Sequence, residues 1–228
     1  RMVICPNINH NAEQILKAIA AKSPEKVIDF FGKRLAHEKG LQSSRGYDEV
    51  PYEFHDLRET LQKIPEQLVA KVREWFASDN ELFAYRGGRM IAAVFPEPED
   101  QLLKPLHELA GTGKLDDVEF VIEVLKNYHG QVVLHDLFKD LIAALPEGSP
   151  LLGEISVALD SAGVVAGEFG HVATYLRKKD EIKPWLDDPR EKVRAFAHNQ
   201  TLGLERQIAD EQRRAEQGLE LRKRNYGE

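Results

Sequence analysis

The sequence predicts an all-α fold, and three observations support this prediction. Apolar residues recur at helical spacing along the whole chain, and the clearest stripe is Leu134, Leu137, Phe138, Leu141, Ile142 and Leu145. Alternation of β-branched residues is never sustained, because Val132-Val133 and Val164-Val165 are too short to build a sheet. Short turn signals separate the stripes, as at Asn127-Tyr128-His129-Gly130, which closes with glycine. We therefore expect antiparallel helical hairpins.

Three such hairpins are expected in the body of the chain. Their apolar stripes lie at 15–19 with 27–35, at 64–76 with 82–94, and at 118–125 with 134–145. Ser23-Pro24 is typical of a helix cap and first turn, and Pro65 suits the first position of the helix it opens. The hairpins recur at intervals of about 35 to 50 residues, a spacing typical of helical solenoids.

Residues 185–197 are predicted to form the end of one helix, a short turn and the start of a new helix. Asp188 can cap this helix, Pro189 suits its first position, and Glu191 lies where a capping-box carboxylate reaches back to the free amides. Val193, Phe196 and Ala197 then form an apolar face.

Residues 182–204 resemble a HEAT repeat, in which an Asp, a Val-Arg pair and a small residue recur. Here these are Asp188, Val193, Arg194 and Ala197. The resemblance implies a HEAT/armadillo-like α-α superhelix, with residues 1–228 as a single domain and Asp188 and Arg194 bonding between repeats. A globular helical domain of non-repeating topology remains the alternative. The first residues, beginning with Arg1-Met2, lead us to expect a segment of a longer protein.

The end of the chain, residues 189–225, is expected to form one long helix. Leu204, Ile208, Ala215 and Leu219 share one face, but the far half is largely polar and ends in a basic tip: Arg213, Arg214, Arg222, Lys223 and Arg224. Two interpretations stay open for this half. It is either a charged cap that keeps the array soluble or a docking helix for a partner or a neighbouring domain.

Two segments interrupt the helical pattern. Residues 40–56 lack helical spacing yet carry Tyr47 and Tyr52, so this loop either packs over its own domain or binds a ligand. Residues 160–170 contain three glycines and are expected to form a hinge or a tight crossover between helices.

Arg86-Gly87-Gly88-Arg89 places two guanidinium groups around a glycine pair inside an otherwise helical stretch. Each glycine would weaken a helix by about 1 kcal/mol relative to alanine, so something must compensate. Close helix approach or a turn is one interpretation. The other is a site where Arg86 and Arg89 grip a carboxylate or phosphate.

The motif search predicts no catalytic residue, metal site or cofactor. Gly111-Thr112-Gly113-Lys114 lacks the first glycine and the final hydroxyl of a phosphate-binding loop, so we interpret it as a turn between helices. The eight histidines form no H-E-x-x-H motif, and the serines no G-x-S-x-G elbow.

One enzyme family is a further alternative. Trp75 and Asp79 have the i, i+4 relation of a Trp and an Asp in the HEAT-like alkylpurine DNA glycosylases, and Trp185 would be a second aromatic. Those enzymes present a basic groove, whereas this chain has a formal net charge of −7. Trp75 also falls on an apolar stripe, where a core role is expected.

Composition sets the remaining expectations. No apolar run approaches the roughly 20 residues of a membrane span, and the single cysteine, Cys5, fits a reducing cytoplasm. We expect a non-catalytic module that binds a protein partner or serves as the regulatory arm of a larger protein; a nucleic-acid-binding solenoid is the alternative. The candidate binding residues are Arg86, Arg89, Arg213, Arg214, Tyr47 and Tyr52.

Overall fold

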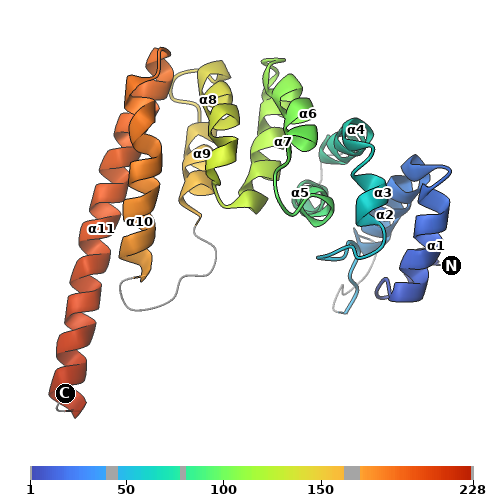
Figure 1. The fold of residues 1–228 in the computed structure, drawn as a ribbon, viewed down its shortest axis with the longest axis horizontal. Helices are drawn as coiled ribbons and strands as arrows, with labels where there is room; N and C mark the ends of the chain where they lie inside the picture. Colours follow the sequence, from blue (N-terminus) through green and yellow to red (C-terminus); the bar gives the residue numbers. More distant parts are fainter. Residues whose placement is uncertain (1, 40–45, 78–80, 162–169, 227–228) are drawn as a thin grey trace. The chain divides into compact units, whose positions relative to one another are not determined.

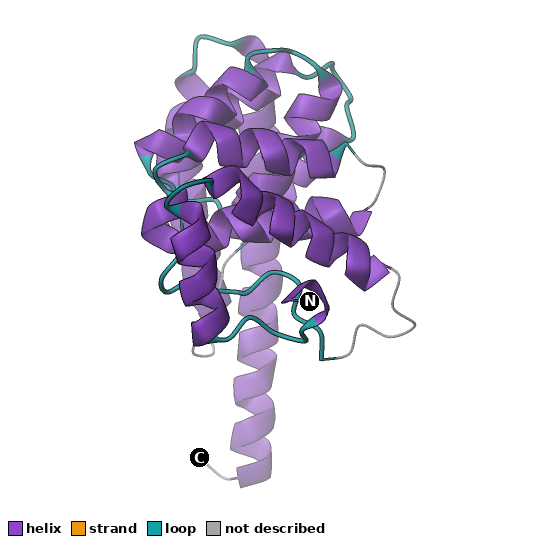
Figure 2. Ribbon diagram, turned by 90° about the vertical axis from the view of Figure 1, so that its right-hand side faces the viewer, coloured by secondary structure: helices purple, strands orange, loops and turns teal. Residues whose placement is uncertain are grey.

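The computed structural model describes residues 2–39, 46–77, 81–161 and 170–226. Within these ranges the chain forms eleven α-helices, four 3-10 helices and no strand, which confirms the all-α prediction (Figure 2). The chain divides into two compact units, Arg1–Tyr128 and His129–Glu228. In the described part of the chain, no helix has the length and apolar character needed to cross a membrane.

The first unit is built from successive helix pairs (Figure 1). Helix α1 packs against α2, α4 against α5, and α6 against α7, while α5 also contacts α7. The first two pairs are the hairpins predicted at 15–35 and 64–94. The elements of this unit are η1 (Met2–Ile4), α1 (His10–Ala20), α2 (Pro24–Lys39), α3 (Arg58–Leu61), α4 (Pro65–Phe76), α5 (Glu81–Val94), α6 (Asp100–Ala110), α7 (Leu115–Leu125) and η2 (Lys126–Tyr128).

Local chemistry explains where these helices begin. Asn9 precedes α1, and its side-chain oxygen accepts a hydrogen bond from the amide of Ala12 at 2.9 Å. Helix α2 begins at Pro24 directly after Ser23, and α4 begins at Pro65, as the sequence predicts. The core lies between these helices, where Phe31 packs edge-on against Phe54 with ring centroids 5.3 Å apart.

Helix α5 runs without interruption through Gly87 and Gly88. A Cβ atom at Gly87 would lie 2.6 Å from a methyl group of Val72 on α4. A Cβ atom at Gly88 would lie 2.7 Å from the side-chain nitrogen of Asn127 and 3.1 Å from the carbonyl oxygen of Glu123 on α7. Close helix approach therefore explains the glycine pair, because α5 is packed tightly on two sides.

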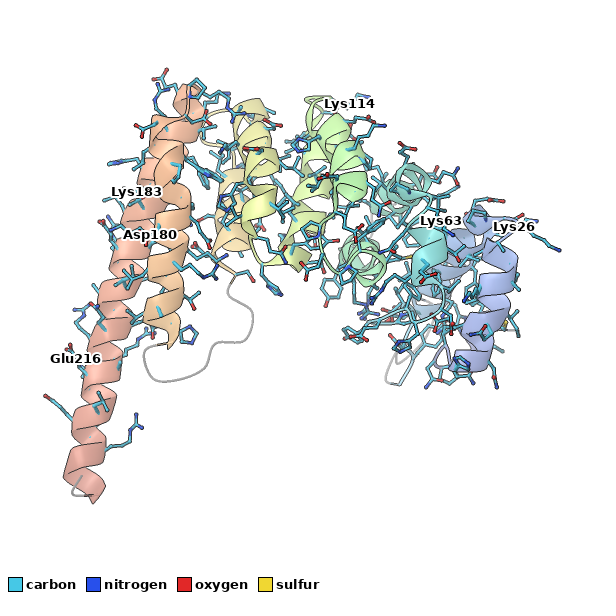
Figure 3. All side chains as sticks on the ribbon, in the orientation of Figure 1. Lys26, Lys63, Lys114, Asp180, Lys183 and Glu216 are labelled. Carbon is cyan, nitrogen blue, oxygen red and sulfur yellow. The ribbon has the colours of Figure 1, made fainter. Side chains whose placement is uncertain are left out.

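The second unit contains a short and a very long helix side by side. Its elements are η3 (Val132–Leu134), α8 (His135–Ala144), α9 (Leu151–Asp160), α10 (Gly170–Ile182), η4 (Lys183–Asp187) and α11 (Glu191–Tyr226). Helix α11 packs against α10 and α8. With 36 residues it is about 54 Å long, against about 20 Å for the 13 residues of α10. Its C-terminal half therefore extends beyond α10, as Figure 1 shows, and carries exposed residues such as Glu216 (Figure 3).

The long helix begins at Glu191, two residues later than expected. The Asp188 carboxylate accepts hydrogen bonds from the amide of Arg190 at 3.0 Å and from its guanidinium at 2.9 and 3.0 Å. These bonds hold residues 188–190 in a turn, so Pro189 precedes the helix instead of occupying its first position. The first backbone bond of the helix runs from the amide of Arg194 to the carbonyl of Arg190.

Bonding between helices at this turn involves Arg190. Arg194, which we expected to make such bonds, donates instead to the carbonyl oxygens of Asp188 at 2.7 Å and Pro189 at 2.9 Å. It therefore stabilises its own turn. Arg190 reaches Asp140 on α8 at 2.8 Å, because the Asp188 carboxylate holds its guanidinium in a fixed orientation.

Some predictions are not addressed by the described residues. The boundary between the two units falls inside the turn 127–130, so the pairing of 118–125 with 134–145 stays a prediction, as does the single domain over 1–228. Residues 162–169 of the expected glycine hinge lie outside the described residues.

Candidate interaction groove

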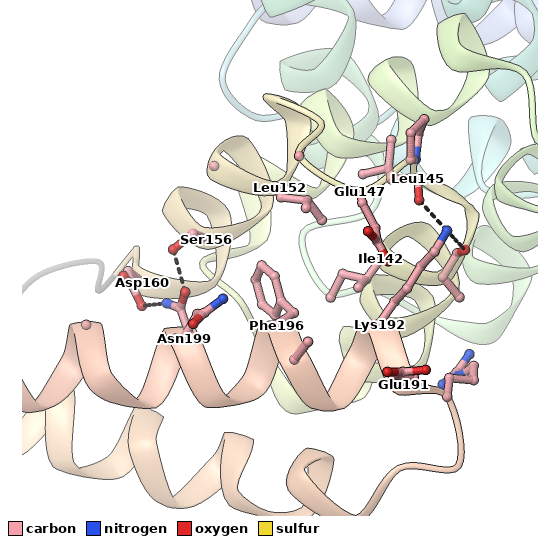
Figure 4. A pocket seen from close by; sticks show the side chains of 18 of the residues that line it. Ile142, Leu145, Glu147, Leu152, Ser156, Asp160, Glu191, Lys192, Phe196 and Asn199 are labelled. Atoms are coloured by element: carbon pink, nitrogen blue, oxygen red, sulfur yellow. Dashed lines mark hydrogen bonds between the residues drawn. The ribbon is translucent and has the colours of Figure 1, made fainter.

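The second unit contains a groove of about 880 Å³ between α9 and the first half of α11 (Figure 4). The end of α8 and the α8–α9 loop complete its lining. Its apolar lining residues are Ile142, Ala143, Leu145, Pro146, Leu152, Ala195 and Phe196; its other lining residues are Glu147, Gly148, Gly153, Ser156, Asp160, Arg190, Glu191, Lys192, Asn199, Gln200, Gly203 and Gln207.

Aromatic rings of the core pack behind the apolar middle of the groove. Phe196 lines the groove, and its ring lies 6.4 Å from that of Trp185, which is 1% exposed. Trp185 in turn packs edge-on against His135 of α8, with ring centroids 5.0 Å apart. Phe196 is 9% exposed, so its side chain adds a small apolar patch to the groove while most of it packs in the core.

A polar network closes one end of the groove. Gln200 of α11 accepts a hydrogen bond from the hydroxyl of Ser156, and its amide donates to Asp160 at 2.6 Å. Both partners lie on α9, so Gln200 ties the two walls together, with Asn199 beside it (Figure 4). Burial raises the pKa of Asp160, while the hydrogen bond from Gln200 and the charge of Lys178 oppose that rise.

Basic side chains at the other end are engaged within the protein. Lys192 donates to the carbonyl oxygens of Ala143 at 3.3 Å and Leu145 at 2.7 Å, which lie at the C-terminal end of α8. Arg190 is held by Asp188 and Asp140.

The acidic side chains at this end are free. Glu147 and Glu191 are exposed and make no ion pair or hydrogen bond with the part of the chain that the structure describes. The unsatisfied charge at this end of the groove is therefore negative.

Both walls of the groove carry a glycine that faces open space. Gly153 lies on α9 and Gly203 on α11, and a Cβ atom built on either one meets no atom within 4 Å. Unlike Gly87 and Gly88, these glycines are not required by packing within the protein. They widen the groove on both sides.

The groove includes none of the predicted binding residues. Its clearest sequence signal is a second face of the long helix, on which Lys192, Phe196, Asn199, Gly203 and Gln207 recur at helical spacing. This face mixes polar, small and aromatic residues, so it does not stand out as an apolar stripe.

Arg86 and Arg89 grip carboxylates that belong to the first unit itself. The Arg86 Nε atom lies 2.5 Å from a Glu49 oxygen and Arg89 Nη2 lies 2.9 Å from the same oxygen. Arg89 also contacts Asp48 at 3.1 Å, and Arg86 lies 3.7 Å from Glu38. Glu49 is 1% exposed, so these interactions are largely buried and support the fold.

The described part of the aromatic loop, residues 46–56, packs over its own unit. Val50 and Phe54 are buried, and the Tyr47 hydroxyl donates to the carbonyl of Val3. Tyr52 is 71% exposed, but the Arg89 guanidinium lies 4.3 Å from the centre of its ring. These contacts favour the packing interpretation; residues 40–45 lie outside the described part.

The organising residue of this region is Arg34, which the sequence analysis did not single out. It is fully buried and donates to six backbone carbonyl oxygens, those of Met2, Val3, Cys5, Pro6, Asp48 and Glu49. Its position three residues after Phe31 places it on the buried face of α2. A charged residue on an apolar stripe is the signal that could have revealed it.

The remaining candidates are distributed over separate parts of the chain. Arg213 pairs with Asp210, and Arg214 with Glu211 at 2.6 Å, on the exposed half of α11. Trp75 is 8% exposed in the core of the first unit, consistent with the packing role expected of it, and Asp79 lies outside the described residues.

The loop at Gly111–Lys114 is a turn between α6 and α7, as interpreted from the sequence. Gly113 has a φ of +68° there, a conformation that favours glycine. Among the described residues, no group of three or more His, Cys, Asp and Glu side chains could hold a metal ion. Comparisons with protein-family models, with curated proteins and with solved structures find no match to this chain.

Proposed function

We propose that this chain is a non-catalytic helical interaction module, which binds a segment of a protein partner or of a neighbouring domain that it regulates. The observation that carries the proposal is the groove between α9 and α11. It has apolar residues at its centre, Phe196 among them, and polar groups at its ends. This is the anatomy of a protein-binding surface, where an apolar centre is surrounded by a polar rim.

The proposal includes a HEAT-like arrangement of the helix pairs. The Asp188, Val193 and Arg194 pattern and the succession α1/α2, α4/α5 and α6/α7 support it. Such arrays present surfaces built from residues that are distant in sequence, and they suit recognition of macromolecules. The lone cysteine, Cys5, supports a cytoplasmic location.

The test uses the full chain and two leucine variants of the same helix. Gly203→Leu fills the groove, and Gly218→Leu adds the same side chain outside it, because both glycines lie on α11 facing open space. Each variant is immobilised and the proteins it retains are identified. We expect a protein that wild type and Gly218→Leu retain in high salt and after nuclease treatment, and that Gly203→Leu loses.

Two outcomes would contradict this proposal. Retention that disappears with salt or nuclease would favour the nucleic-acid-binding solenoid, because cation-phosphate contacts dominate such binding. A protein retained equally by Gly203→Leu would show that another surface carries the interaction.

A further inference from the structure

We propose that the apolar part of this groove takes one bulky apolar side chain from a partner segment in an extended or turn conformation, with a Lys or Arg next to that residue. This inference rests on the proposed function and adds the chemistry of the recognised segment. It follows from the bridge that divides the groove, from the apolar surface on one side of the bridge and from the charges at the rim.

The side chain of Gln200 divides the groove into two parts. Its hydrogen bonds to two residues of α9 join that helix directly to α11 (Figure 4). Every apolar lining residue lies on one side of this bridge: Ala195 and Phe196 precede it on α11, Leu152 precedes it on α9, and the others come from the end of α8 and the α8–α9 loop. We call this part of the groove the apolar pocket.

The apolar pocket exposes carbon surface from three separate elements. Leu152 of α9 is half-buried, while Pro146 of the loop and Ala195 of α11 are exposed. Ile142 of α8 and Phe196 also line the pocket but are only 1% and 9% exposed, so they lie at its base. An apolar side chain that enters the pocket is therefore removed from water on several sides.

The apolar surface is too short for the side of a helix. A helix bound in a groove uses apolar anchors at i, i+3 or i+4 and i+7, which span about 10 Å. Here α9 contributes Leu152 alone and α11 contributes only the neighbours Ala195 and Phe196, so each wall is apolar over less than one turn, about 5 Å. This length fits one anchoring side chain.

The free charges at the rim of the apolar pocket are negative. Glu147 of the loop and Glu191 of α11 are exposed and make no ion pair or hydrogen bond with the residues that the structure describes (Figure 4). The cations beside them have partners, because Arg190 pairs with two aspartates and Lys192 binds carbonyl oxygens at the end of α8. A Lys or Arg beside the anchoring residue is therefore attracted, and an Asp or Glu there is repelled.

The experiment uses three tetrapeptides with blocked ends, which are too short to form a helix. Their central residues, between glycines, are Leu-Lys, Leu-Glu or Ala-Lys. Each peptide is titrated into the isotope-labelled full chain, and the backbone amide signals are followed by NMR. We expect signals of the apolar pocket to shift with the Leu-Lys peptide, with a dissociation constant in roughly the millimolar range, because one side chain is buried and the ion pairs are exposed.

The other two peptides separate charge from apolar contact. The Leu-Glu peptide should bind about fivefold more weakly at low salt, because two exposed carboxylates then repel it. Salt should narrow this difference. The Ala-Lys peptide should bind about tenfold more weakly, because its side chain buries three fewer carbon atoms.

Variants of the full chain locate the site. Gly153→Leu should abolish binding, because Gly153 lines the pocket and a Cβ atom there meets nothing within 4 Å, so the new side chain occupies the open space. Gly218→Leu, outside the groove, should leave binding unchanged. The double variant Glu147→Gln with Glu191→Gln should remove most of the difference between the Leu-Lys and Leu-Glu peptides. Circular dichroism checks that the helices persist, since Glu191 also stabilises the N-terminal end of α11.

Each contrary result has a distinct meaning. Equal affinity for the Leu-Lys and Leu-Glu peptides would overturn the assignment of a cation to the partner segment. Equal affinity for the Leu-Lys and Ala-Lys peptides, or binding that survives Gly153→Leu, would overturn the apolar anchor. Unshifted signals at about 10 mM peptide would overturn the inference as a whole. The partner capture described above judges the proposed function independently of these peptides.

Discussion

Replacing Gly88 with alanine tests the close packing of α5 against α7. The new Cβ atom would lie 2.7 Å from the side-chain nitrogen of Asn127 and 3.1 Å from the backbone oxygen of Glu123. The Asn127 amide is not free to move, because it donates to the carbonyls of Glu123 at 3.1 Å and Val124 at 3.3 Å. The backbone of α7 must therefore shift, or these hydrogen bonds must break.

Two opposing contributions set the size of the effect. Alanine is favoured over glycine inside a helix by about 1 kcal/mol. Breaking the two Asn127 hydrogen bonds costs about 1 kcal/mol each, and overpacking typically costs about 1–3 kcal/mol. Together the two costs amount to about 3–5 kcal/mol against a gain of about 1 kcal/mol, so we expect Gly88→Ala to reduce the free energy of unfolding of the first unit by about 2–4 kcal/mol.

The assay is urea denaturation with hydrogen exchange, which reports the stability of α5 and α7 separately from the second unit. Gly203→Ala is the matched control, because its Cβ atom meets nothing within 4 Å. It should stabilise α11 by about 0.5–1 kcal/mol. If Gly88→Ala proved as stable as wild type, or more stable, the proposed tight contact between α5 and α7 would be refuted.

Three further substitutions test buried and capping charges by chemical denaturation. Arg34→Met should destabilise the first unit by about 3 kcal/mol or more, because six carbonyl oxygens lose a charged donor; a loss below about 1 kcal/mol would contradict this role. Burial and the nearby Glu49 carboxylate raise the pKa of Glu38 in the folded state. Ionising Glu38 therefore disfavours the folded state, and the stability of the wild type falls as pH rises from the usual carboxyl pKa through this raised pKa. Glu38→Gln should therefore gain stability relative to wild type as pH rises above the usual carboxyl range. If the difference in unfolding free energy between the variant and wild type shrank as pH rose, the raised pKa of Glu38 would be contradicted. Hydrogen bonds from Arg190 lower the pKa of Asp188 to about 2, so its contribution is complete above the usual carboxyl pKa and is lost as pH falls towards 2. Asp188→Ala should cost about 1–2 kcal/mol at neutral pH and nothing near pH 2, whereas an equal loss at both pH values would rule out the ion pair.

Local patterns predicted several of the helices, because helix formation depends on spacing and end signals within a few residues. Ser23 and Pro24 open α2, Pro65 opens α4, and the buried residues of α8 follow the predicted stripe. Asp188 shows the limit of such signals. Its carboxylate binds the guanidinium of Arg190 as well as a backbone amide, so the helix begins later than a capping box predicts.

Side-chain partners between helices were less predictable. Arg86 and Arg89 were expected to grip an acidic group, and they do, but the groups are Glu49, Asp48 and Glu38 of the same unit. These carboxylates lie 37 to 48 residues away from their arginine partners in sequence, and no local pattern connects them.

The sequence by itself determined the all-α character, the starts of α2 and α4 and the presence of the long C-terminal helix, because hydrophobic spacing and capping act over one or two turns. Only the tertiary structure decided which glycines are confined and which face open space, and which charges are already neutralised. Gly88 and Gly203 look alike in sequence, yet one touches α7 and the other lines a groove. The difference arises because packing brings together residues that are distant along the chain.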